Sequence, residues 1–475
     1  MRAVEPTQRG DVHLSVFDSK GISKGTQLRD PSKPSAAGSP PPEGHSPTQE
    51  SILINRNVMS HITHINRERR IREAVLLSFC DPVSDEVEQL LHLSAGEWRR
   101  LLRWLDTSGL ALYFLDRFTE QGLRDALPQG VIDRLQQNMD DNTKRTRGMV
   151  DESVAIQIEF KRTAVSYAVM KGLALSPVSV PRPELRHQLD LDYLVAEKSA
   201  PEARRILERR GYRLYAISGK SWEFKINETP RISTKDFYKD LPSRAVELHL
   251  EADSKGVHSR LNRIVNREMF GITMPIFSPV DLFLNQGLHA FKDVCSAFSR
   301  TAHILEFYRH VLAYRNDDPF WQELRSVAER DRRASLGIGV VTYLITSIMG
   351  HFAPEALTEW TVNVLPPSVR LWVDRYGRRT VFADHPGRKL YLLLEKELEA
   401  AGIPAKRPLK KSLLPSRLPP FVIRSSSNEG LSTRIARYRM QVHFVFSRLR
   451  FHLVEGVRYA IESYRWRRHL DRLPS

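Results

Sequence analysis

Two aspartates, Asp190 and Asp192, stand two residues apart in the segment Gln188–Val195, whose composition and alternation are typical of a strand. Alternate side chains of a strand share a face, so these carboxylates project together. Carboxylates this close repel each other unless a positive charge lies between them. Because no cysteine is near, oxygen ligands predict Mg²⁺ or Mn²⁺ rather than zinc.

A second acidic strand is predicted over residues 245–253. One face carries Val246, Leu248, Leu250 and Ala252, and the other carries Glu247, His249, Glu251 and Asp253. If this strand lies beside the first, Glu247 can complete a carboxylate triad that His249 could orient. A single strand of this kind would be an exposed amphipathic strand with solvated acids, but two such strands in one small unit weaken that alternative.

Three carboxylates that bind two metal ions suit in-line phosphoryl or nucleotidyl transfer. One ion lowers the pKa of the attacking hydroxyl, and the other neutralises the triphosphate and the leaving pyrophosphate. Lys171-Gly172 follows the apolar segment Ala164–Met170, which predicts a buried strand. A glycine lets a phosphate approach the backbone and a lysine supplies charge, so this dipeptide is a candidate nucleotide-binding element.

Further basic side chains are candidates for contacts with a nucleotide. Arg186 precedes the first aspartate and could bind a phosphate in a bidentate manner or pair with Glu184. His289 and Lys292 share a helix face and could reach a triphosphate; a structural histidine and a solvated lysine are the alternative. Glu306 could be a further acid of the site, but an ordinary helix-surface glutamate is expected.

The elements that must position these residues form an α+β arrangement, a small mixed sheet framed by N- and C-terminal helical regions. Residues 1–50 are rich in proline, serine, glycine and charge, which predicts disorder. The helical spacing of apolar residues predicts a helical N-terminal region over 51–160 and a helical C-terminal domain over 256–403. Between them, the predicted strands indicate a catalytic domain over 161–255. Residues 404–475 form a basic tail with an amphipathic helix.

The net charge of +16 is concentrated in that tail, where residues 404–475 hold 16 lysines and arginines against four acids. The rest of the chain is close to balance. Arginines interleaved with aromatic residues could grip a nucleic acid, lie on an anionic membrane surface, or belong to a helix docked on its own domain. An acidic protein is a further possible partner, and a solvated helix is the alternative to any binding role.

Other features of the composition indicate a cytoplasmic protein. Cys80 and Cys295 lie far apart, which provides neither a disulfide framework nor zinc spacing and fits a reducing compartment. The N-terminus lacks the apolar core of a secretory signal. The apolar run Ala334–Gly350 is short for a membrane span and predicts a buried helix, so no transmembrane segment is expected.

Several of these stretches together carry a family resemblance. They are Met170-Lys171-Gly172, Glu184-Leu185-Arg186, Leu189-Asp190-Leu191-Asp192-Tyr193-Leu194-Val195, Arg209-Arg210-Gly211-Tyr212, Glu247-Leu248-His249, Pro279-Val280-Asp281-Leu282 and Leu288-His289-Ala290-Phe291-Lys292. In this order they resemble the uncharacterised nucleotidyltransferase family of the DNA polymerase β-like superfamily. The motif-like part covers Met170 to His249, and the general layout extends over roughly residues 51–394.

The resemblance implies a metal-dependent transfer of a nucleotidyl group from an NTP to an unidentified acceptor hydroxyl or phosphate, with Asp190, Asp192 and Glu247 as metal ligands. Two departures stand out. The superfamily's usual Gly-Gly/Ser pair is replaced by Lys171-Gly172-Leu173, and Glu247 stands where aspartate is more usual. Both favour the alternative of a non-catalytic nucleotide-binding or adaptor protein. The layout also resembles nucleotidyltransferase toxins that modify transfer RNA.

Overall fold

The computed structural model describes residues 66–226, 237–240, 244–252, 259–297, 300–384, 387–404, 408–414 and 430–472. The segment 1–50, predicted to be disordered, lies outside the described residues. So do the first part of the predicted helical region, residues 51–65, and Asp253 at the end of the second acidic strand.

A seven-stranded mixed sheet forms the centre of the fold and is flanked by helices, which confirms the predicted α+β class. The strand order is β3-β4-β5-β2-β1-β7-β6. β2 pairs in parallel with β5 and antiparallel with β1. The strands are β1 (Tyr167–Val169), β2 (Asp190–Ala196), β3 (Arg213–Ser218), β4 (Ser221–Lys225), β5 (Ala245–Glu251), β6 (Val265–Met269) and β7 (Ile272–Ile276).

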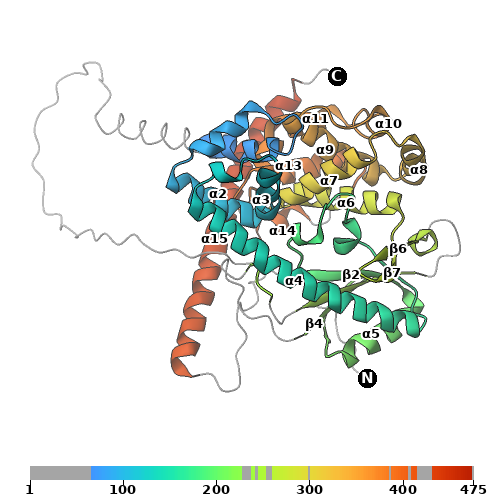
Figure 1. The fold of residues 1–475 in the computed structure, drawn as a ribbon. Coiled ribbons are helices and arrows are strands. Elements are labelled where there is room, and N and C mark those ends of the chain that lie inside the picture. Colours follow the sequence, from blue (N-terminus) through green and yellow to red (C-terminus); the bar gives the residue numbers. More distant parts are fainter. Residues whose placement is uncertain are drawn as a thin grey trace, which may run out of the picture.

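The long helix α4 (Gln129–Arg162) fixes the core face of β2 (Figure 1). The ring of Phe160 on this helix packs edge-on against that of Tyr193, with centroids 5.6 Å apart. The hydroxyl of Tyr193 forms a hydrogen bond of 2.9 Å with Ser153 Oγ, so its one polar atom is satisfied inside the core. Since alternate side chains of β2 are held in this core, Asp190 and Asp192 must project from the opposite face.

The structure corrects the predicted boundary at residue 255, because the sheet continues beyond it. β6 and β7 form a hairpin, and β7 pairs in parallel with β1 at Val169 and Ile276. The turn between them consists of Phe270 and Gly271, both with positive φ (53° and 77°). A two-residue hairpin needs this conformation at both positions, and a phenylalanine at the first gives no local signal for it.

Of the remaining helices, α5 packs on β2 and β3, and most of the others gather on one side of the sheet and build the helical part of the molecule. The apolar run Ala334–Gly350 forms the buried helix α9, as expected, and no helix among the described residues is long and apolar enough to cross a membrane. The helices are α2 (Ala95–Ser108), α3 (Ala111–Glu120), α5 (Ala200–Arg209), α6 (Pro279–Val294), α7 (Thr301–Ala313), α8 (Asp318–Ala328), α9 (Arg332–Met349), α10 (Glu355–Thr358), α11 (Pro367–Trp372), α12 (Arg378–Val381), α13 (Tyr391–Ala400), α14 (Leu409–Leu413) and α15 (Leu431–Leu470).

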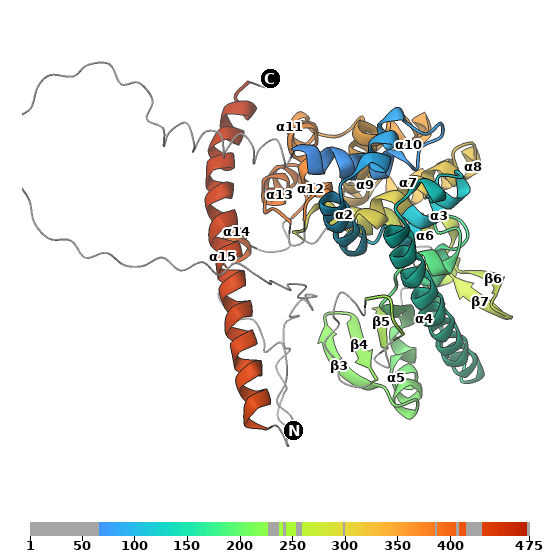
Figure 2. The same cartoon turned by 60° about the vertical axis from the view of Figure 1, so that its left-hand side comes forward.

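The helix predicted in the basic tail is α15, and its C-terminal part is docked on the body (Figure 2). Trp466 is 1% exposed, and its Nε1 donates a hydrogen bond of 2.9 Å to Glu397 on α13. Tyr376 donates one of 2.9 Å to Glu462. The docked-helix alternative therefore describes this end of α15, where an aromatic residue belongs to the core.

Candidate functional site

The parallel pairing of β2 with β5 places three carboxylates on one face of the sheet. Asp192 lies directly opposite Glu247 in the register, and Asp190 precedes Asp192 by one alternation. Asp192 is 4% exposed, while Asp190 and Glu247 are partly buried. The two acidic strands are thus neighbours, as the sequence analysis required for a triad.

Two basic side chains lie among these carboxylates. Lys171 Nζ is 2.8 Å from Asp192 Oδ1. His249 Nε2 lies 3.2 Å from the same oxygen and 3.5 Å from Glu247 Oε2, so this ring bridges the two acids. Ser221 on β4 donates a hydrogen bond to Glu247. No sequence pattern marks Ser221, because only the pairing of β4 with β5 brings it to the site.

The pKa shifts show where the charge of the cluster is balanced and where it is not. Burial and the neighbouring Asp192 raise the pKa of Asp190 to about 6. Burial alone would also raise the pKa of Asp192, but Lys171 and His249 outweigh it and hold that pKa below its usual range. Lys171 and His249 in turn have raised pKa values, because the carboxylates outweigh the burial that would lower them. The positive groups therefore compensate the charge of Asp192 more fully than that of Asp190.

This donor set fits a divalent cation. Ligand atoms of Asp192, Glu247 and His249 all lie within 4.8 Å of one another, and the carboxylate of Asp190 shares their face. Carboxylate oxygens are the preferred ligands of Mg²⁺ and Mn²⁺. The pKa of Asp190 stays raised because Lys171 and Arg186 do not outweigh its burial and the neighbouring carboxylates, and a cation would add positive charge there.

The Lys171-Gly172 loop is held against the start of β2. Gly172 has a φ of +63°, and a Cβ there would lie 2.3 Å from the side-chain nitrogen of Gln188. That nitrogen donates a hydrogen bond of 2.7 Å to the Asp190 carbonyl. From the other side, Asn285 on α6 donates one of 3.0 Å to the carbonyl of Met170. Only glycine fits both the backbone angle and the close approach of Gln188.

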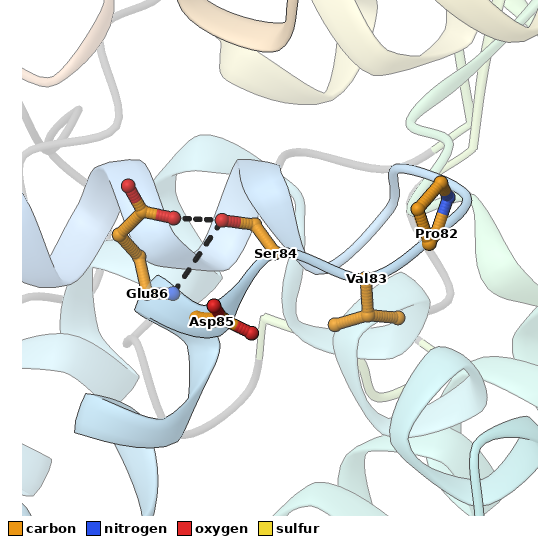
Figure 3. A pocket seen from close by; sticks show the side chains of 5 residues that line it. All are labelled: Pro82, Val83, Ser84, Asp85 and Glu86. Atoms are coloured by element: carbon orange, nitrogen blue, oxygen red, sulfur yellow. Dashed lines mark hydrogen bonds between the residues drawn. The ribbon is translucent and has the colours of Figure 1, made fainter.

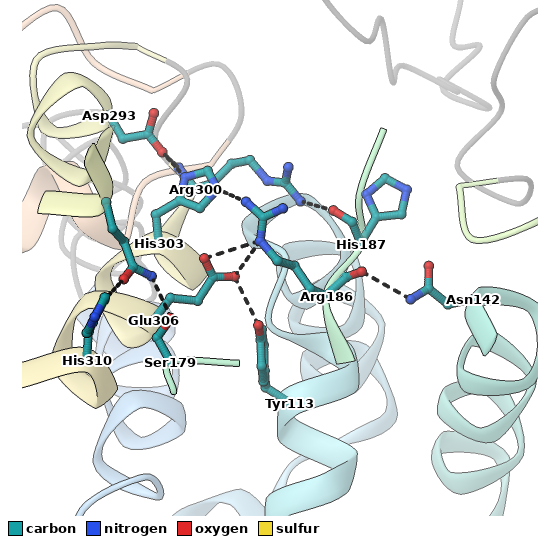
Figure 4. Close-up of polar contacts among 11 residues, drawn as sticks. Tyr113, Asn142, Ser179, Arg186, His187, Asp293, Arg300, His303, Glu306 and His310 are labelled. Atoms are coloured by element: carbon teal, nitrogen blue, oxygen red, sulfur yellow. Dashed lines mark hydrogen bonds and ion pairs between the residues drawn. The ribbon is translucent and has the colours of Figure 1, made fainter. Parts of the chain in front are cut away.

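Arg186 has a structural partner that the sequence analysis did not anticipate (Figure 4). Its Nε donates to both carboxylate oxygens of Glu306 at 3.1 and 3.3 Å, and Tyr113 donates to the same carboxylate at 3.0 Å. The pairing with Glu184 is therefore replaced by one with Glu306. Because Glu306 is 1% exposed, the expectation of a helix-surface glutamate was wrong. A contact of Arg186 with phosphate stays a prediction.

His289 belongs to a second cluster that includes Asp293 and His303, two residues missed by the sequence analysis. The ring centroids of His289 and His303 are 4.3 Å apart. His303 Nδ1 is 2.6 Å from Asp293 Oδ2 (Figure 4). Arg186 can only donate to His303 Nε2, at 3.4 Å, so the Nδ1 of His303 carries the proton that it shares with Asp293. Burial lowers the pKa of both histidines.

The arginines beside this cluster make it a poor cation site, although its atoms are close enough to hold a metal. Arg186 contacts His303, and the backbone N–H of Arg300 donates to Asp293 at 3.2 Å. The positive charges of Arg300 and Arg186 also help to lower the pKa of His303, and they oppose the binding of a cation beside it. Lys292 is exposed on α6, and its contact with a nucleotide also stays a prediction.

A surface hollow lies away from the sheet, on the loop Pro82–Glu86 before the short helix Asp85–His92 (Figure 3). Its lining consists of five consecutive residues, and Ser84 caps the helix by accepting from the Glu86 backbone N–H at 3.4 Å. A hollow formed by one turn brings no groups together from different elements. It does not compete with the carboxylate cluster as a site of chemistry.

Comparisons with known proteins agree with this geometry. The sequence profile of a family described as uncharacterised nucleotidyltransferase matches residues 94–346, more than half of the chain, and this range contains both acidic strands. No curated protein matches the chain.

Solved structures that match include the antibiotic-resistance factor ANT(2'')-Ia, with 14% identity over 40% of this chain and 94% of its own, at a TM-score of 0.31. An antigenic nucleotidyltransferase-like protein from Paracoccidioides brasiliensis matches with 14% identity over 44% of this chain and 94% of its own, at 0.25. These TM-scores are too low to support the fold, which rests on the sheet itself and on the family match.

Proposed function

The chain belongs to the uncharacterised nucleotidyltransferase family, and on that premise we propose that it transfers a nucleotidyl group from an NTP to an acceptor hydroxyl or phosphate, dependent on Mg²⁺ or Mn²⁺. The observation that carries the proposal is the β2–β5 register, which sets Asp192 opposite Glu247 with Asp190 on the same face. Lys171 lies at this face as well.

In this proposal Asp190, Asp192 and Glu247 hold the cation. A bound divalent cation neutralises the triphosphate and lowers the pKa of the attacking hydroxyl. His249 positions Asp192 through its hydrogen bond and Glu247 through the ion-pair contact at 3.5 Å.

The nucleotide would be held from two sides. Lys171 exchanges Asp192 for a phosphate oxygen, and the positive φ of Gly172 allows the turn that follows this lysine. From α6, His289 and Lys292 face the triphosphate, and Arg186 adds positive charge from the loop before β2. The proximity of Lys171 to His289, which helps to lower the pKa of this histidine, supports a common nucleotide surface.

A non-catalytic nucleotide-binding protein is the second candidate, and one observation favours it. Lys171 and His249 already neutralise Asp192 and Glu247, so the fold can be stable without a metal ion. Isothermal titration with Mg²⁺ and each NTP, followed by a search for transfer, separates the two candidates. A protein that binds an NTP but transfers nothing fits the second.

The test of the first candidate is a transfer assay with labelled NTPs against RNA, protein and small-molecule acceptors in the presence of Mg²⁺. Asp190→Asn and Asp192→Asn should each abolish transfer while the protein stays folded. Chelation of the metal should have the same effect on the wild type. Transfer at the wild-type rate by the double Asn variant would exclude the catalytic assignment.

A further inference from the structure

Helix α15 has two faces of different character. One contacts the body through Glu455, Glu462 and Trp466. The other carries exposed apolar side chains, among them Ile435 (60%), Val442 (67%), Phe446 (67%), Leu449 (48%), Leu453 (54%) and Val457 (62%). At 100° per residue these positions fall on the side of the helix away from the body contacts. An apolar surface of this extent indicates an interaction site.

The spacing of the exposed residues turns them into one straight stripe, here called the apolar stripe. Leu431, Val442, Leu453 and Tyr464 recur every eleven residues. Eleven residues advance by three helical turns plus about 20°, so the stripe rotates only slightly around the helix axis. A helix of 40 residues extends over about 60 Å, which makes the stripe a long and nearly flat contact line.

The charges along α15 are divided between the two faces. The helix has nine arginines and two acids, and both acids face the body. Glu455 accepts from the Lys389 backbone N–H at 3.1 Å, and Glu462 accepts from Tyr376. Exposed arginines lie beside and within the apolar stripe: Arg434 and Arg450 are on its two sides, whereas Arg439 shares the angular position of Val457. The outward surface therefore combines apolar side chains with arginines.

We propose that α15 lies in the headgroup layer of an anionic lipid bilayer, with the apolar stripe toward the acyl chains and the arginines among the phosphates. This arrangement removes the apolar stripe from water and pairs the arginines with the phosphates of the lipid headgroups. A second copy of the helix would cover the apolar stripe but bring arginines against arginines, without an acid to pair them. A nucleic acid would pair the arginines but leave the aliphatic side chains of Ile435, Val442 and Leu449 without a partner.

The experiment is co-sedimentation of the full chain with phosphatidylcholine vesicles that contain either no anionic lipid or phosphatidylglycerol. Leu449→Asp and Leu453→Asp place a charge in the apolar stripe. Ala436→Asp adds the same charge at an exposed position outside the stripe and is the matched control. Replacing Arg434, Arg439 and Arg450 by glutamine tests the electrostatic part. Circular dichroism and the tryptophan fluorescence of the whole chain report whether each variant keeps its fold.

We expect the wild type to bind anionic vesicles, and high salt to weaken this binding. Each stripe variant and the arginine variant should bind at least about tenfold more weakly, and the control should bind like the wild type. The proposal is overturned if the full chain does not bind anionic vesicles, or if folded stripe variants bind as well as the wild type. Self-association that the stripe variants abolish, or binding of RNA in place of vesicles, also overturns it.

Discussion

Glu247 and Glu251 share one face of β5, but their surroundings predict different roles. Glu247 faces Asp192 and His249, whereas Glu251 accepts from Ser259 and from the backbone of Leu261. We expect Glu247→Gln to lower transfer by at least about a hundredfold, because a metal-binding or proton-accepting group is lost. The rate of Mg²⁺-dependent transfer is the measurement.

The matched control is Glu251→Gln, which should stay within a few-fold of the wild-type rate because strand rise puts it about 13 Å from Glu247. Glu247→Asp should keep partial activity, since it retains a carboxylate that can bind the cation. If Glu251→Gln is inactive and Glu247→Gln is active, the site lies at the Glu251 end of β5 and the assignment of Glu247 is wrong.

The raised pKa of Asp190 predicts a pH-dependent effect on stability in the metal-free protein. Its folded pKa of about 6 lies above the value near 3.9 of an unfolded aspartate, so the stabilisation is complete below about pH 4 and is lost as the pH rises through 6. Asp190→Asn avoids this loss. With a chelator present, we expect the variant to be more stable than the wild type by on the order of 1 kcal/mol at pH 8.

Urea unfolding at pH 8 and at pH 4.5 checks this expectation. The advantage of Asp190→Asn over the wild type should shrink at the lower pH, where the native carboxyl is protonated. An advantage of equal size at both pH values would mean that the charge of Asp190 does not cause it.

Among the elements, the loop after β1 makes the clearest demand on a residue type. Gly172 and Gly211 both have positive φ, 63° and 89°, but only Gly172 is crowded by another side chain. We expect Gly211→Ala to cost about 1 kcal/mol of stability from backbone strain alone. Gly172→Ala should cost more and also weaken NTP binding, because Gln188 must move away from the loop.

Thermal unfolding and isothermal titration with an NTP measure the two effects of this pair of variants. Equal destabilisation by both variants would show that the contact with Gln188 does not restrain the loop. Unchanged NTP binding by a folded Gly172→Ala variant would separate the loop from the nucleotide.

For the whole molecule, Glu306 joins parts of the chain that are far apart in sequence. It lies on α7 and binds Arg186 from the loop before β2 and Tyr113 from α3. We expect Glu306→Ala to destabilise the protein by about 3–5 kcal/mol, because it leaves the buried Arg186 without its partner. The free energy of unfolding in urea is the measurement.

Glu359→Ala is the control, since Glu359 pairs with Arg325 at 2.9 Å but its side chain is 57% exposed. An exposed pair of this kind contributes about 0–1 kcal/mol. If the two variants lose similar amounts, the Arg186–Glu306 pair does not hold the three segments together.

The sequence by itself determined the local patterns. Asp190 shares a strand face with Asp192, and Glu247 shares one with His249, because side chains alternate with a period of two in every strand. The buried helix α9 likewise followed from its composition. The family resemblance, which the profile match confirms, was carried by short motifs that are each continuous in sequence.

Only the tertiary structure decided which groups meet. The register of Asp192 with Glu247, the choice of Glu306 as the partner of Arg186, and the joining of β6 and β7 to the sheet all depend on contacts between distant segments. Periodicity did not separate the two faces of α15 either, because apolar residues occur all around this helix. Contact with the body determines which of them are buried, and Trp466 is one. Backbone geometry repeats within a segment, whereas pairing and burial depend on what the rest of the chain places against it.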